Sequence, residues 1–217
     1  MPSTDGAPST GKSMGTDRNE KPMPRSSKIM RETSETHIAL SLGLDGLGTC
    51  EVETGVPFFD HMLTALGRHA LIDLSVKATG DIGVDAHHTV EDVGIVLGQA
   101  FAQALCDKAG IARFGWAVIP MDEALVLAAI DISGRGQLHY DVDLPIEIIG
   151  TFDTTLAKEF LVAFASNAGL TLHVRSFAGG NSHHIIEAAF KAVARALRDA
   201  VAIDSRVTGV PSTKGSL

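Results

Sequence analysis

The feature that most constrains the fold of this chain is an internal duplication. Segment 60–77 aligns without gaps with segment 158–175, and each aligned stretch leads into one copy of the pattern HHxxE, at 87–91 and at 183–187. The aligned hydrophobic pairs are Met62 with Phe160, Leu63 with Leu161, Leu66 with Phe164, Leu74 with Leu172, and Val76 with Val174. Because the unit is far longer than a solenoid repeat, it predicts two similar half-domains that share one fold.

Hydrophobic periodicity predicts the same elements in each half. In the first half these are strands at 37–44 and 49–53, joined through Asp45-Gly46, then a helix at 57–70, a strand at 71–79 and a helix at 85–107. In the second half they are a strand pair at 124–134 and 137–143, a helix at 151–169, a strand at 170–178 and a helix at 183–201. We therefore expect an α+β fold, with halves at 29–112 and 113–217, in which each half buries one sheet face under two helices.

Composition narrows the class of protein. The net charge of −8 gives no support to nucleic acid or an anionic membrane as a partner, although it does not exclude a phosphorylated ligand. Cys50 and Cys106 form no CxxC pair, which favours a reducing cytoplasm. No apolar run approaches the roughly 20 residues of a membrane-spanning helix, and the start of the chain lacks the apolar core of a secretory signal.

Residues 1–28 are rich in Pro, Gly, Ser, Thr and charge, and this composition predicts a disordered tail. A transit peptide and a remnant of cloning are the alternatives. The acidic residues Asp5, Asp17 and Glu20 argue against a transit peptide, because such segments are usually poor in acid.

The paired HHxxE patterns carry the chemistry: His87, His88 and Glu91, then His183, His184 and Glu187. Neighbours on an α-helix point about 100° apart, whereas residues three or four apart share a face. The Glu of each pattern can therefore approach a metal with one histidine while the other histidine points elsewhere. A single pair would suit an ordinary polar helix start, but two copies at equivalent positions indicate metal binding. Imidazole and carboxylate without thiolate suit Mn, Fe, Ni or Zn.

Further ligands are expected from the preceding helix of each half. His61 lies in the first of these helices, and the alignment places Glu159 at the equivalent position in the second. Both side chains are competent ligands. The remaining histidines have no other potential ligand at a spacing in the sequence that suggests a site, and they are interpreted as structural or surface residues. They are His37, His69, His139 and His173.

A second group of candidate residues is basic. Arg113 lies between the halves, Arg135 follows a strand, and Lys214 lies in the sequence PSTKGS next to Ser212. A Gly/Ser/Thr loop with a lysine can present backbone N–H groups and an ammonium to an anion, although this one lacks the Walker A pattern. Together with two metals, these residues suggest a phosphorylated substrate.

These motifs resemble the imidazoleglycerol-phosphate dehydratase family. The matching stretches are 31–36, 55–70, 85–100, 110–115, 120–135, 181–197 and 210–217, so the resemblance runs from about residue 30 to the end. It implies a duplicated fold like the second domain of ribosomal protein S5, with two antiparallel or mixed sheets. It further implies a homo-oligomer of 24 subunits with active sites at subunit interfaces and two Mn(II) ions per active site, other divalent metals being possible.

The resemblance also implies roles for single residues. The metal ligands it implies are His61, His87, His88, Glu91, His183, His184 and Glu187, with Glu159 at a position that varies in the family. The residues that match phosphate-binding positions are Arg113, Arg135, Ser212 and Lys214. Glu35 matches an acidic residue near the substrate. The expected reaction is dehydration of imidazole glycerol phosphate to imidazole acetol phosphate.

The expected mechanism starts from an imidazole ring bound to the metal as imidazolate. Loss of the side-chain hydroxyl would then give a conjugated diazafulvene. A carboxylate, Glu187 or Glu35, would move the carbon proton, and His88 and Glu91 complete the predicted catalytic set. The sequence does not choose between the two carboxylates.

Two other readings stay open at this point. A dinuclear metallohydrolase acting on a phosphoester would also use two metals and an anion pocket, although such sites usually depend on bridging carboxylates. A non-catalytic shell, in which the histidines only join subunits through metal, would assemble with metal but release no ketone product.

Overall fold

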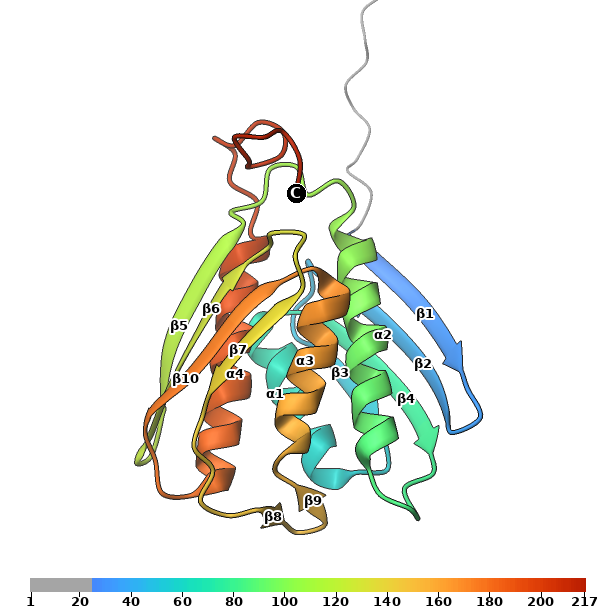
Figure 1. The fold of residues 1–217 in the computed structure, drawn as a ribbon. Coiled ribbons are helices and arrows are strands. Elements are labelled where there is room, and N and C mark those ends of the chain that lie inside the picture. The colour runs from blue at the N-terminus through green and yellow to red at the C-terminus, as the bar shows by residue number, and fades with distance from the viewer. Residues whose placement is uncertain (1–24) are drawn as a thin grey trace, which may run out of the picture.

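The computed structural model describes residues 25–217, and the elements of these residues repeat one order twice along the chain (Figure 1). The first half consists of β1 (Ser26–Glu32), β2 (Thr36–Gly43), β3 (Cys50–Glu53), α1 (Pro57–Ala70), β4 (Asp73–Gly80) and α2 (His87–Leu105). The second consists of β5 (Phe114–Met121), β6 (Ala124–Asp131), β7 (Gln137–Asp141), α3 (Leu156–Ala168), β10 (Thr171–Ala178) and α4 (Ser182–Val201). A short hairpin of β8 (Ile148–Ile149) and β9 (Phe152–Asp153) precedes α3.

Each half forms one mixed four-stranded sheet, and the two sheets have equivalent strand orders. The orders are β1-β2-β4-β3 and β5-β6-β10-β7, with the last strand of each parallel to its neighbour and the others antiparallel. The shared order confirms the predicted α+β fold built from two similar halves.

The four helices lie between the two sheets (Figure 1). Helix α2 packs on β1 and β2, and α4 packs on β5 and β6. Across the halves, α2 packs against α3 and α1 packs against α4. The core therefore sits in the middle of the molecule, where the inner faces of both sheets meet helices. Among the described residues, no helix combines the length and the apolar character needed to cross a membrane.

Small residues allow the halves to approach closely. A Cβ atom at Gly94 of α2 would lie 2.8 Å from the carbonyl oxygen of Phe160, and one at Gly98 would lie 2.7 Å from that of Phe164. Both distances are shorter than side chains tolerate, so glycine at these positions lets α2 lie directly on the backbone of α3. This contact fixes the two halves against each other and hence the relative placement of their histidines.

The order of strands differs from the prediction. We expected 37–44 to lie beside 49–53 and 124–134 beside 137–143, but β4 separates β2 from β3, and β10 separates β6 from β7. The adjacency was wrong because the last strand of each sheet runs parallel to its neighbour. Sequence proximity favours antiparallel hairpins, whereas a parallel pair needs a crossover connection.

The sequence prediction also missed the first strand of each half, β1 and β5. The expected disordered tail ended at residue 28, yet Ser26 to Lys28 pair with β2; residues 1–24 lie outside the described residues. Helix α3 begins at Leu156 rather than at 151, because β9 occupies the start of that segment. The side chain of Asp153 then accepts a hydrogen bond from the backbone N–H of Thr155 at 2.9 Å, ahead of the helix.

Candidate metal centre and anion pocket

Three of the expected ligands converge where α1 meets α4. His61 projects from α1, while His183 and Glu187 stand one turn apart on α4. Glu187 Oε2 lies 3.3 Å from His61 Nε2 and 3.2 Å from His183 Nε2. The three ligand atoms lie within 4.8 Å of one another, which allows them to share one cation. Among residues 25–217, this is the one group of three or more such side chains close enough to do so.

Glu187 has the surroundings of an ionised carboxylate. Its side chain is only 9% exposed, and burial opposes the charged form. The ammonium of Lys191, 2.7 Å from Oε1, and the ring of His61 outweigh that burial, so the pKa of Glu187 lies below its usual range. A carboxylate held in its charged form is ready to bind a cation.

The first HHxxE pattern divides its two histidines between different partners. His87 Nε2 lies 3.4 Å from Glu91 Oε2 on the same face of α2. The ring of His88 faces away and its Nδ1 lies 3.0 Å from Asp81 Oδ2 and 3.9 Å from Glu35 Oε2. The hydrogen bond to Asp81 raises the pKa of His88, with Glu35 adding to the effect.

The second pattern divides its histidines in the same way. His183 contacts Glu187, whereas His184 Nδ1 lies 2.7 Å from Glu123 Oε2 and His184 Nε2 lies 3.6 Å from Asp122 Oδ2. The bond to His184 lowers the pKa of Glu123 to about 2, and the same bond raises the pKa of His184. In both halves, therefore, the first histidine shares a face with its own Glu and the second turns to carboxylates of other elements.

Glu123 and Asp81 were missed by the sequence reasoning. Glu123 lies in the turn between β5 and β6, and Glu35 lies in the equivalent turn between β1 and β2. Each of these carboxylates faces the second histidine of its own half, His184 or His88. The duplication was the signal that could have found Glu123, because it maps the turn of Glu35 onto the turn of Glu123.

Glu159 does not join the three-residue group. It lies on α3 and lines a separate cavity of about 520 Å³ with Tyr140, Glu147 and Lys158 among its neighbours. The equivalent residue, His61, reaches Glu187 because α1 packs on α4. Of the eight expected ligands, the structure thus brings three together within one chain.

The histidines that were interpreted as structural or surface residues are not members of this group. His139 and His173 lie directly opposite each other on the parallel strands β7 and β10, with ring centroids 4.2 Å apart. This stacking depends on strand register, which the spacing in the sequence did not indicate. His69 lies beside Lys191 and Arg195, and burial together with these cations lowers its pKa.

The basic residues gather around a cavity of about 210 Å³ at the end of α4. Its lining consists of Arg113, Ser133, Arg135, Ser212, Thr213, Lys214, Ser216 and Leu217. The backbone N–H of Lys214 donates to Ser212 Oγ at 3.2 Å, which closes the loop on itself. Three cationic side chains with several hydroxyl groups make this cavity suitable for an oxyanion.

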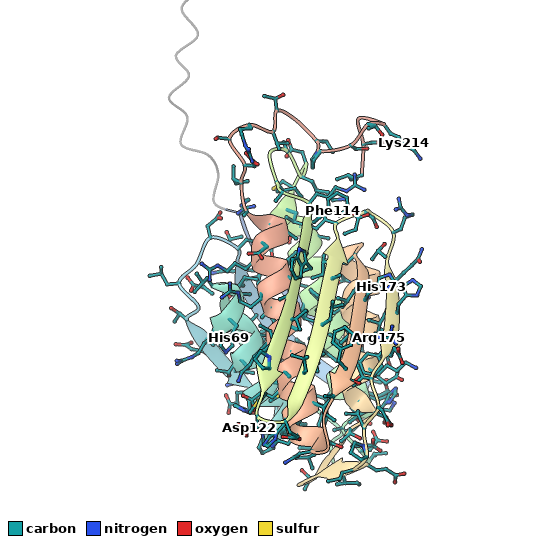
Figure 2. The ribbon with its side chains drawn as sticks, turned by 90° about the vertical axis from the view of Figure 1, so that its left-hand side faces the viewer. His69, Phe114, Asp122, His173, Arg175 and Lys214 are labelled. Carbon is teal, nitrogen blue, oxygen red and sulfur yellow. The ribbon has the colours of Figure 1, made fainter. Side chains whose placement is uncertain are left out.

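The anion pocket and the candidate metal ligands lie at opposite ends of the molecule. Helix α4 carries His183 in its first turn and leads at its other end toward the C-terminal loop, and at 1.5 Å per residue its 20 residues span about 30 Å. Figure 2 shows Lys214 at one end of the molecule and Asp122, a neighbour of His184, at the other. One chain alone cannot bring both groups to a small ligand.

Comparisons with known proteins point to one family. The family model for imidazoleglycerol-phosphate dehydratase matches residues 54–197. The chain is 60% identical over 196 residues to the protein of that name from Acidiphilium cryptum, covering 90% of this chain and all of the relative. It is 58% identical over 193 residues to the one from Desulforamulus reducens, covering 89% and 98%.

Solved structures agree with the sequence relatives. The crystal structure of imidazoleglycerol-phosphate dehydratase from Staphylococcus aureus superposes with a TM-score of 0.76 at 40% identity, covering 82% of this chain and 99% of that chain. The enzyme from Pyrococcus furiosus superposes with the same TM-score at 38% identity, covering 87% and 100%. Fold and sequence comparisons thus identify the same group of proteins.

Proposed function

The chain belongs to the imidazoleglycerol-phosphate dehydratase family, and from this premise we propose that it converts D-erythro-imidazole glycerol phosphate into imidazole acetol phosphate. Its relatives are named imidazoleglycerol-phosphate dehydratase, so the chain is a hydro-lyase, and we assign its reaction to histidine biosynthesis. The observation that carries the proposal to this chain's own residues is the convergence of His61, His183 and Glu187 from two helices.

The converging side chains fit the metal that the family resemblance implies. Two imidazoles and one ionised carboxylate, with no thiolate, form a mixed nitrogen and oxygen donor set that suits Mn(II) and some other divalent cations. When bound, such a metal supplies Lewis acidity toward a ring nitrogen of the substrate. The remaining proposed ligands for a pair of Mn(II) ions per active site are His87, His88, Glu91, His184 and, as the least supported, Glu159.

The separation of the two ends supports an active site shared between chains. The substrate joins its ring to its phosphate through a short glycerol chain, while the metal ligands and the anion pocket of one chain stand a helix length apart. A second copy that brings its anion pocket to the metal ligands of the first would complete the site. This arrangement supports the expected homo-oligomer, for which we keep 24 subunits as the proposed number.

An exposed apolar surface supports association as well. On the outer face of β5, Phe114 is 60% exposed and Trp116 is 68% exposed, and Val118 continues the same face. Large exposed apolar side chains grouped on one sheet are typical of contact surfaces between proteins. On the outer face of the first sheet, Met30 of β1 is 74% exposed, but the neighbouring surface around Ser41, Ser75 and Glu51 is polar.

The anion pocket would hold the phosphate of the substrate. Arg135 and Lys214 present cationic groups, Ser212 presents a hydroxyl, and Arg113 completes the lining. Binding of the phosphate away from the reacting carbon adds binding energy that orients the imidazole end. Arg113 and Arg135 come from one side of the cavity and the C-terminal loop from the other.

Glu35 is the stronger candidate for moving the carbon proton. The oxygens of Glu187 face His61, His183 and Lys191, so this carboxylate is already committed to holding its neighbours. Glu35 is half exposed, and its Oε2 lies 3.9 Å from His88. We therefore assign the proton transfer to Glu35 and a ligand role to Glu187.

Two variants separate these roles. In E35Q we expect full metal content and a loss of single-turnover dehydration of at least about a hundredfold, the range expected for a lost general acid or base. In E187Q we expect a loss of bound metal as well as activity, because the amide lacks the charge that pairs with the cation. Metal analysis and a single-turnover assay on both proteins measure whether activity is lost alone or together with bound metal. Full activity of E35Q would exclude Glu35 as the residue that moves the proton.

The proposed function is tested most directly by chelation. We expect the purified protein to contain divalent metal and to form a ketone product, detected by ultraviolet absorbance, from imidazole glycerol phosphate. A chelator should abolish product formation, and Mn(II) should restore it. Release of inorganic phosphate from a panel of phosphomonoesters would instead favour a metallohydrolase, and metal-dependent assembly without ketone would favour a structural shell.

The state of the two cysteines is the basis on which we propose a cellular location. Cys50 and Cys106 are both free, and Cys106 is exposed. Free thiols of this kind are typical of a reducing environment, which supports a cytoplasmic location.

A further inference from the structure

Arg113 differs from the other cations of the anion pocket because a carboxylate already holds it. Asp131, the last residue of β6, lies 2.7 Å from Arg113 Nε through Oδ1 and 3.2 Å from Nη2 through Oδ2. The pair is largely buried, with the side chains 16% and 23% exposed. Arg135, by contrast, is 64% exposed and approaches Asp131 only at 4.0 Å.

The held guanidinium in turn holds the C-terminal loop. Arg113 Nη1 donates to the carbonyl oxygen of Pro211 at 2.9 Å, and Pro211 directly precedes Ser212, Thr213 and Lys214 of the pocket. These contacts use three N–H groups, and within the part of the chain that the structure describes, one N–H on each terminal nitrogen is left for an anion. Arg113 thus joins the sheet, the loop and the cavity.

The backbone of Arg113 adopts an unusual conformation that the surrounding structure holds in place. Arg113 has φ +72°, a left-handed conformation that is unfavourable for a side chain other than glycine. Its backbone is held in that conformation by hydrogen bonds from its N–H to Ala200 and to its carbonyl from Ile132. The guanidinium also lies over the ring of Phe114, 4.7 Å from its centroid.

We propose that Asp131 is the positioning residue of the anion pocket: its two oxygens orient Arg113 so that the guanidinium anchors the loop at Pro211 and presents its remaining N–H groups to phosphate. The inference rests on the proposed function only for the identity of the phosphorylated substrate. The pocket's ability to bind an oxyanion is a property of this chain that can be measured without the reaction.

The direction in which phosphate affinity changes when Asp131 is removed distinguishes a positioning role from a simple charge effect. Asp131 is a negative charge next to an anion site, so its removal would strengthen phosphate binding if it acted through charge alone. If it orients Arg113, its removal weakens phosphate binding despite the gain of positive charge, because a charge-assisted, bidentate contact is lost. The two accounts predict changes of opposite direction.

The experiment measures inorganic phosphate binding by calorimetry on the full chain and on D131N. We expect D131N to bind phosphate at least about tenfold more weakly, the range for a lost charge-assisted hydrogen bond. We expect kcat/KM for imidazole glycerol phosphate to fall by a similar factor, with KM raised more than kcat is lowered, because the phosphate contact both binds the substrate and orients its reacting end. D131E keeps both acceptor oxygens and should recover part of the phosphate affinity.

The matched control is D141N. Asp141 pairs with Arg175 at 3.1 Å on the outer face of the same sheet, where its side chain is 77% exposed, so D141N changes the net charge equally at a distant place. It should bind phosphate as the unsubstituted protein does. Unchanged or tighter phosphate binding by D131N overturns the inference, and so does an unsubstituted protein that binds no phosphate. If D131N does not fold, phosphate binding by D131E decides, and affinity no weaker than that of the unsubstituted protein overturns the inference.

The result is independent of the proposed reaction. A protein that binds phosphate through an Asp131-dependent pocket but forms no ketone would refute the dehydratase assignment and leave this inference standing. If the protein forms ketone but D131N retains its phosphate affinity and KM, the dehydratase assignment stands and this inference is refuted.

Discussion

At the scale of single residues, one glycine lies where a strand meets a helix without a side chain between them. Gly115 of β5 faces α4, and a Cβ atom there would lie 2.0 Å from the carbonyl oxygen of Ala196 and 2.8 Å from the backbone nitrogen of Ala200. Both neighbours are helix backbone, which cannot rotate away as a side chain can. The second sheet therefore contacts α4 backbone to backbone at this point.

We expect G115A to lower the free energy of unfolding by about 3 kcal/mol, the upper part of the range for overpacking, because β5 must move away from α4. The control is G83A, because Gly83 has no atom within 4 Å of its virtual Cβ and should change stability by less than about 0.5 kcal/mol. Urea unfolding of both variants measures the difference. Equal stability of G115A and the unsubstituted protein would mean that this contact is looser than described.

Tyr140 gives a prediction about pH, because it is the single tyrosine of the chain. Burial raises the pKa of its phenol to about 12. An unfolded chain should titrate near 10. The folded state thus favours the neutral phenol, so its contribution to stability is complete below about pH 10 and is lost as the pH rises toward 12. Phenolate absorbance in native and urea-unfolded protein should titrate at these two values, and Y140F should abolish the signal. A native titration near 10 would contradict the burial of this phenol.

At the scale of elements, a side-chain oxygen accepts a backbone N–H at the start of both helices that carry an HHxxE pattern, α2 and α4. The backbone N–H of His183 donates to Asn181 Oδ1 at 3.0 Å, and that of His87 donates to Asp85 Oδ1 at 2.8 Å. Asn181 and Asp85 occupy equivalent positions in the two halves. Asn181 is the N-cap residue of α4, where such an acceptor stabilises the first turn, whereas the N-cap of α2 is Ala86 and has no side-chain cap.

We expect N181A to lower stability by about 1 kcal/mol and to weaken metal binding at His183, because the first turn of α4 frays. N181D retains the acceptor oxygen and should keep both properties. Thermal unfolding without metal gives the first quantity, and titration with Mn(II) gives the second. If N181A lost stability but kept its metal affinity, the cap would be separate from the metal site.

At the scale of the whole molecule, the separation of metal ligands and anion pocket is the dominant property. The long α4 keeps them apart by about 30 Å, and the close backbone contact of α2 with α3 joins the two halves directly. This separation supports our proposal that assembly of copies, rather than closure of one chain, completes an active site.

Complementation tests this arrangement. We expect E187Q and R135A each to be inactive alone, since one lacks a proposed metal ligand and the other a proposed phosphate contact. When the two chains are unfolded together and reassembled as a mixture, roughly a quarter of the shared sites should combine an intact Glu187 with an intact Arg135. Dehydration by the mixture should therefore recover to about that fraction of the activity of the unsubstituted protein. No recovery in a confirmed mixed assembly would place both residues in the site of one chain.

Much of the fold could be predicted because it depends on local pattern. Helix α1 spans 57–70 as its hydrophobic spacing predicted, and α4 begins within one residue of the prediction. The duplication implied equivalent halves, and the two sheets share one strand order. The first strand of each half escaped detection because its short alternation follows a polar segment or a turn, where the pattern is weak.

The sequence by itself determined what lies within one helix turn. That one histidine of each HHxxE pattern shares a face with its Glu follows from 3.6 residues per turn. The structure adds which one it is, His183 with Glu187 and His87 with Glu91. The gathering of basic residues at one cavity was also indicated, through the resemblance of the C-terminal loop to a known family.

Only the tertiary structure decided which elements meet. His61 reaches Glu187 because α1 of one half packs on α4 of the other, and Glu159 stays outside the group although the alignment makes the two equivalent. The hold of Asp131 on Arg113 likewise depends on where β6 ends against the connection between the halves. Such contacts join residues far apart in the chain, and they are set by sheet register and helix packing rather than by spacing along the sequence.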